Sequence, residues 1–169
     1  EPLAFLGMAL YTVAMARRGG RRHDNSIALS WSVGCGIMSF VGAGFLGFAH
    51  TLPQVNIWTH GTLVTAMHGH LAFWGAYSML IFAMIAYALP EMTGRKAFKH
   101  WSNEWAFWLS NIGMICMTGA FAVAGITQVY LERRVGMDFL AVQEAVQVHF
   151  LGLVLAAVLF TAGIGLYIW

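Results

Sequence analysis

The sequence contains very little charge. Only 9% of its 169 residues are Asp, Glu, Lys or Arg, whereas an average soluble domain carries roughly 25%. This scarcity excludes an ordinary water-soluble globule. Nine Lys and Arg against seven Asp and Glu leave a formal net charge of +2, and no basic run carries interleaved aromatic residues. We therefore expect no nucleic-acid partner.

Cysteine is also scarce, and both Cys35 and Cys116 lie in apolar runs. A thiol in such a run usually behaves as a small buried hydrophobe, so neither residue indicates a disulfide or a cysteine-ligated metal. The chain begins at Glu1 without a Met, and it ends at Trp169 inside an apolar stretch. We therefore expect it to be a piece of a longer chain.

Long apolar runs are what the sequence has in abundance. Hydrophobic residues make up 59% of the chain, and no charged residue occurs between Asp24 and Glu91. A membrane crossing needs about 20 apolar residues. The pattern predicts an all-α, polytopic bundle of transmembrane helices in a lipid bilayer, forming one membrane region over residues 1–169. The predicted helices lie near 3–16, 27–50, 62–89, 105–130 and 146–169.

Lys and Arg are concentrated in two of the four connections, 17–22 and 90–103. The second connection, 51–56, carries no charge, and the fourth, 132–144, carries Arg133 and Arg134 beside three acidic residues. The positive-inside rule therefore places the first and third connections in the cytoplasm. The second and fourth connections, together with Glu1, are expected on the outer side.

Three histidines, His60, His68 and His70, stand close together at the outer end of the third predicted helix. A histidine within a membrane is a functional-site candidate by default. On an α-helix, His68 and His70 are separated by about 200° and cannot easily share one metal. Imidazole is a common axial ligand of haem iron, so one haem on each flank would suit them. His60 would lie about 12 Å of helix further out, beside a propionate edge. The alternative is that each histidine only hydrogen-bonds to a neighbouring helix.

Other polar and small residues are given structural interpretations. His50 ends the second predicted helix, and we expect its hydrogen bonds to be satisfied within the protein. His149 in the last helix is not expected to be a ligand. Gly42 is a small helix residue that permits close backbone approach.

The string His60-Gly61-Thr62 followed by His68-Gly69-His70 resembles the helix X signature of haem-copper oxidase subunit I. Oxidases have Asp and Phe where Gly61 and Gly69 stand here. With the stretches 47–56 and 71–77 on either side, the pattern resembles the catalytic (cytochrome b) subunit of cytochrome c-dependent nitric oxide reductases. The resemblance implies that the chain supplies the last five of twelve transmembrane helices.

The resemblance also implies roles for single residues. His68 would be the proximal ligand of a high-spin haem b at which NO is reduced, and His70 one axial ligand of a low-spin haem b. His60 would hydrogen-bond to the propionates of the active-site haem, unless it only marks the membrane interface. Glu1 matches a glutamate implicated in proton delivery near a non-haem iron, although an acidic residue also favours a helix start.

The same resemblance implies the setting of the enzyme. It would reduce two NO to N2O and water in the inner (cytoplasmic) membrane of a bacterium, with electrons from a membrane-anchored cytochrome c subunit. The ligands of the non-haem iron and the second ligand of the low-spin haem would lie on earlier helices. Two alternatives stay open: a haem-copper terminal oxidase that reduces oxygen, and a non-catalytic membrane scaffold or transporter fragment.

Overall fold

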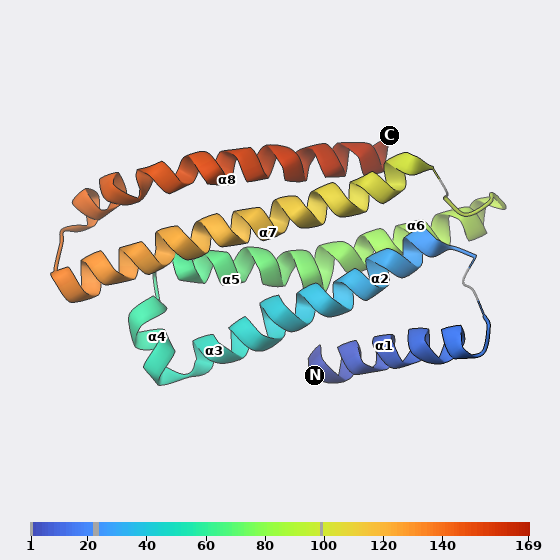
Figure 1. The fold of residues 1–169 in the computed structure, drawn as a ribbon, viewed down its shortest axis with the longest axis horizontal. Coiled ribbons are helices and arrows are strands. Elements are labelled where there is room, and N and C mark those ends of the chain that lie inside the picture. The colour runs from blue at the N-terminus through green and yellow to red at the C-terminus, as the bar shows by residue number, and fades with distance from the viewer. Residues whose placement is uncertain (1, 22–23, 99) are drawn as a thin grey trace.

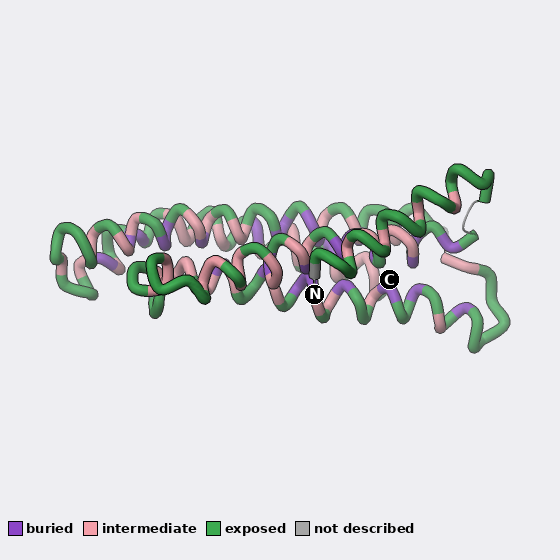
Figure 2. The backbone as a smooth tube through the Cα atoms, turned by 90° about the horizontal axis from the view of Figure 1, so that it is seen from below, coloured by how far each residue is buried: buried purple, intermediate pink, exposed green. Residues whose placement is uncertain are grey.

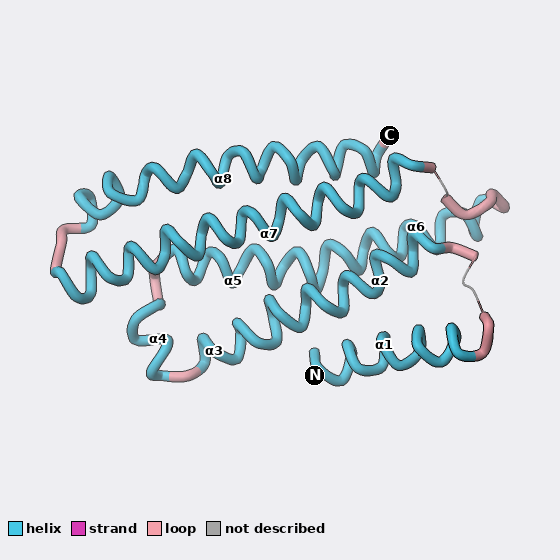
Figure 3. The backbone as a smooth tube through the Cα atoms, in the orientation of Figure 1, coloured by secondary structure: helices cyan, strands magenta, loops and turns pink. Residues whose placement is uncertain are grey.

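The computed structural model describes residues 2–21, 24–98 and 100–169. Its helices lie side by side along one long axis (Figure 1), and the described residues form helices and loops without any strand (Figure 3). The predicted all-α fold is therefore confirmed.

Three of the long helices contain a π-helical turn, written η, that continues directly from the α-helix before it. The elements are α1 (Pro2–Arg18), α2 (Ser26–Ser39), η1 (Phe40–Leu46), α3 (Gly47–Thr51), α4 (Pro53–Thr59), α5 (Leu63–Phe73), η2 (Trp74–Ser78), α6 (Met79–Thr93), α7 (Trp101–Tyr130), η3 (Leu131–Val135) and α8 (Phe139–Ile168). Among the described residues, four continuous helical stretches are long and apolar enough to cross a membrane: Ser26–Thr51, Leu63–Thr93, Trp101–Val135 and Phe139–Ile168. The 17-residue α1 is not one of these four stretches.

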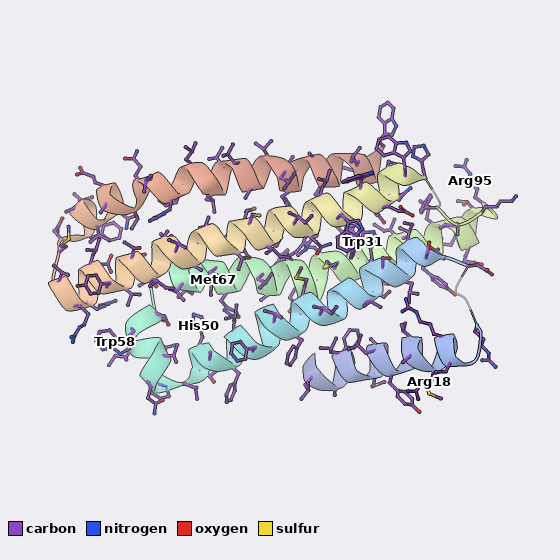
Figure 4. The ribbon with its side chains drawn as sticks, in the orientation of Figure 1. Arg18, Trp31, His50, Trp58, Met67 and Arg95 are labelled. Carbon is purple, nitrogen blue, oxygen red and sulfur yellow. The ribbon has the colours of Figure 1, made fainter. Side chains whose placement is uncertain are left out.

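The connections alternate between the two ends of the bundle, as successive crossings require. Arg18 and Arg95 lie at one end, and His50 and Trp58 lie at the other (Figure 4). The uncharged link at 51–56 differs from the sequence interpretation, because much of it forms α4. Pro53 stands at the start of this helix, where its fixed φ and missing N–H are well tolerated. The α4 helix folds the chain back from α3 towards α5 (Figure 1).

The start of α5 is fixed by hydrogen bonds to its first amides. The Thr62 hydroxyl accepts from the Val64 amide at 3.3 Å, and the Oε1 atom of the buried Gln128 on α7 accepts from the Leu63 amide at 2.9 Å. These bonds satisfy donors that a helix leaves unpaired at its first turn. They also hold the histidine-bearing helix at a fixed height against α7.

Trp31 forms the centre of the main core cluster and is 0% exposed. Its ring centroid lies 5.0 Å from Phe82, 5.2 Å from Phe107 and 6.1 Å from Trp74. Buried positions occupy the inner sides of the helices, whereas the outer sides are exposed (Figure 2). In the apolar windows of the four candidate spans, only 11% to 33% of the residues are buried. The outer faces are therefore apolar surfaces suited to lipid or to further membrane helices.

Two glycines let the backbones of the helix containing η1 and the helix containing α5 touch. A Cβ atom on Gly42 would lie 2.6 Å from the carbonyl carbon of Leu71, and one on Gly75 would lie 2.5 Å from that of Met38. Only glycine fits at such a crossing. Both residues lie in π-helical turns, which occur frequently at functional sites. The crossing brings the Gly42 carbonyl to the side of α5 that carries His68.

Candidate metal-ligating histidines

His68 projects from α5 towards η1. Its Nδ1 atom lies 2.9 Å from the Gly42 carbonyl oxygen. Since a carbonyl oxygen only accepts, Nδ1 carries the hydrogen, and the lone pair of the neutral ring is on Nε2. Metal-ligating histidines commonly have this arrangement, because the backbone bond fixes the tautomer and raises the basicity of the other nitrogen.

His70 has the same tautomer on the other flank of α5. Its Nδ1 lies 2.8 Å from the Ala66 carbonyl oxygen, so its lone pair is also on Nε2. Its ring lies 4.9 Å from that of Phe121 on α7. The two predicted site residues therefore face different neighbours, η1 and α7, as their helical spacing indicates.

A large apolar pocket adjoins His70. It has a volume of about 700 Å³, and its lining includes Gly69, Phe73, Trp74, Met114 and Phe160. Apolar side chains make up almost all of the pocket lining, and His70 supplies its titratable side chain. A large apolar macrocycle whose metal takes an imidazole ligand would match this volume and chemistry. His70 and this pocket therefore fit a haem.

His60 precedes the helix that carries His68 and is not part of it. The α5 helix begins at Leu63, and His60 is an exposed residue at the C-terminal end of α4. Gly61, with φ of +74°, reverses the chain between the two helices, a conformation that suits glycine. The assumption of a continuous helix from His60 to His68 is therefore wrong. Glu1, the other predicted site residue, lies outside the described residues.

His50 is a neighbour of His68 that the sequence interpretation missed. The two rings are stacked, with centroids 4.9 Å apart and planes 21° apart. Nδ1 of His50 is hydrogen-bonded to the Leu46 carbonyl oxygen at 2.8 Å. Within the described part of the chain, its Nε2 is buried and has no hydrogen-bond partner, so the expectation of full satisfaction is wrong. No spacing rule could have found this pair, because it depends on how α4 folds back.

A membrane bundle that presents two backbone-anchored imidazoles on opposite flanks of one helix, one of them beside an apolar pocket, is built like a membrane haem protein. Comparison with known families agrees with this class. Residues 3–159 match the model of the family described as Cytochrome C and Quinol oxidase polypeptide I. The chain belongs to this family of haem-copper oxidase subunits, as its histidine pattern predicted.

Three relatives show where the chain lies within the family. It is 38% identical over 177 residues to a nitric oxide reductase subunit of Stutzerimonas stutzeri, an alignment that covers 100% of this chain and 37% of the relative. It is 32% identical over 92 residues to a cytochrome c oxidase subunit 1 homolog of Agrobacterium tumefaciens (strain T37), covering 54% of this chain and 17% of the relative. It is 30% identical over 105 residues to cytochrome c oxidase subunit 1 of Rhodobacter capsulatus, covering 58% of this chain and 20% of the relative.

The family consists of membrane oxidoreductases that bind haem. Within it, the reductase subunit aligns with the whole chain, whereas the two oxidase subunits align with little more than half. The chain spans about a third of the length of that reductase subunit.

Proposed function

We propose that this chain forms part of a nitric oxide reductase that converts two NO to N2O and water in the inner membrane of a bacterium. The observation that carries the proposal is the pair of imidazoles on α5, with both Nδ1 atoms bound to backbone carbonyls and the Nε2 lone pairs directed to separate flanks. Similarity to a reductase subunit along the whole of this chain supports nitric oxide over oxygen as the substrate.

In this proposal, His68 holds the high-spin haem b and His70 holds the low-spin haem b. When bound, the two haems supply one-electron transfer and an open coordination position for the gas. The chain itself fixes the directions of both imidazoles through the Gly42 and Ala66 carbonyls, which engage Nδ1 and leave Nε2 for the iron. Apolar side chains line the pocket on the His70 side, where they would contact the haem.

The reaction consumes two protons and two electrons for each pair of NO molecules. Glu1 is proposed to deliver protons, and His60 to hydrogen-bond to the propionates of the active-site haem. Support for both roles comes from the resemblance of their sequence positions to those of the reductases. A membrane-anchored cytochrome c subunit is proposed as the electron donor, and the non-haem iron is proposed to be held by other helices of the complete subunit.

The test is the gas chemistry of the complete membrane enzyme that contains this chain, supplied with a chemical reductant. We expect N2O formation from NO, and we expect it to be lost in His68→Ala. His149→Ala, on α8, is the matched histidine control and should retain activity. Oxygen consumption that far exceeds NO consumption would contradict the proposal and favour a terminal oxidase. Absence of haem bands from the intact enzyme would favour a scaffold.

A further inference from the structure

One hydrogen bond alone does not fix the plane of the His68 ring. The bond from Nδ1 to the Gly42 carbonyl oxygen determines where the ring edge points, but a hydrogen bond accepts a range of angles, so the ring plane can still tilt. A ligand that must present Nε2 to an iron in a constant orientation needs a second contact, on a face of the ring.

His50 supplies such a contact. Its ring lies against the face of His68, with the centroids 4.9 Å apart and the planes within 21° of each other. A flat, nearly parallel neighbour resists rotation of the ring beside it, because turning would break the stack or produce a clash. On the edge, a Cβ atom at Gly47 would lie 3.4 Å from Cε1 and 4.0 Å from Nε2 of His68, so the chain at Gly47 runs along this edge of the ring.

His50 is itself held in place from two sides. Its Nδ1 donates to the Leu46 carbonyl oxygen at 2.8 Å, and the Asn56 amide of α4 donates to the His50 carbonyl oxygen at 2.7 Å. The second bond ties the end of α3 to the turn that leads back to α5. His50 therefore has a fixed backbone and a fixed ring, as a supporting residue requires.

We propose that His50 is a positioning residue for the high-spin haem: its imidazole, stacked on that of His68, sets the ring plane of this ligand. The inference rests on the proposed function, in which His68 holds that haem. Nε2 of His50 is buried and has no partner among the described residues. The role therefore depends on the flat ring, and an aromatic ring without nitrogen should fulfil it.

The experiment compares three variants of the complete enzyme. His50→Phe keeps a flat ring, His50→Leu removes it at similar bulk, and His149→Leu is the control on α8. The readouts are the iron–histidine stretching band of the reduced high-spin haem, measured by resonance Raman spectroscopy, and the rate at which haem is lost to an apo-protein acceptor. The low-spin haem spectrum, which depends on His70, reports whether each variant has assembled.

We expect His50→Leu to shift the iron–histidine band and to lose high-spin haem roughly tenfold faster, which is the scale of effects for residues that support a ligand. His50→Phe and His149→Leu should keep the parent band and rate. If His50→Leu fails to assemble, His50→Met, with an unbranched side chain that also cannot stack, replaces it in the comparison.

Several outcomes would overturn the inference. A band unchanged in the non-aromatic variant would show that the stack does not set the ligand plane. Equal shifts in His50→Phe and His50→Leu would show that the nitrogen matters and the flat ring does not. Loss of high-spin haem in His50→Phe, with retention in His68→Ala, would make His50 the ligand. If His68→Ala keeps the high-spin haem and the His50 variants show an unchanged band and rate of haem loss, the proposed function itself is contradicted.

Discussion

Gly42→Ala tests the contact on which both the packing and the His68 site depend. The added methyl group would lie 2.6 to 2.8 Å from three backbone atoms of Leu71 and Ala72. Backbone atoms cannot swing aside as the end of a flexible side chain can. The π-helical turn and α5 must therefore move apart, and the Gly42 carbonyl oxygen must move away from Nδ1 of His68.

The size of the effect follows from three contributions. Overpacking costs about 1–3 kcal/mol, and weakening the hydrogen bond to His68 costs about 1 kcal/mol. Alanine regains about 1 kcal/mol through its higher helix propensity. The free energy of unfolding should therefore fall by about 2 kcal/mol, which is roughly a 30-fold change in the unfolding equilibrium.

The assay is unfolding of the complete enzyme in detergent, followed by circular dichroism, together with the iron–histidine band of the high-spin haem. Gly152→Ala is the matched control, because nothing lies within 4 Å of the added methyl group on α8. Its free energy of unfolding should rise by about 1 kcal/mol, because only the gain in helix propensity acts at this open position. A Gly42→Ala enzyme as stable as this control, with an unshifted band, would refute the close helix crossing and its role at His68.

Three further changes test separate parts of the account. Gly69→Leu should leave the fold intact, because nothing lies within 4 Å of a Cβ atom there, yet it should reduce low-spin haem content by filling the pocket beside His70, as measured by optical spectra. Gln128→Leu leaves the Leu63 amide without its acceptor and should lower the free energy of unfolding by about 1–3 kcal/mol in detergent titrations. An unchanged unfolding midpoint would contradict the role of this hydrogen bond at the start of α5. Glu1→Gln should slow NO turnover at saturating reductant while the haem spectra stay unchanged, and unaltered turnover would remove Glu1 from the proton route.

The sequence predicts the parts of this fold that depend on local patterns. Uncharged apolar runs indicate the long helices, and the spacing of His68 and His70 indicates that they leave α5 on opposite flanks. Both features follow from helix geometry, which acts within a few residues and needs no knowledge of neighbouring helices.

The remaining features depend on contacts between distant segments, which spacing does not encode. The stacking of His50 on His68 requires α4 to return the chain, and the bond from His68 to Gly42 requires a crossing of η1 with α5. His60 shows the same limit. A glycine with positive φ at position 61 separates it from α5, although the apolar pattern alone does not distinguish a turn there from a continuous helix.

The haem content of the complete enzyme tests the central claim most directly. We predict that His68→Ala and His70→Ala each lose one haem b per enzyme, high-spin in the first and low-spin in the second, and that the double variant loses both. Quantitative haem analysis, with His149→Ala as the control, measures this. Retention of both haems in either single variant, or loss of the same haem in both, would contradict the assignment of one imidazole to each.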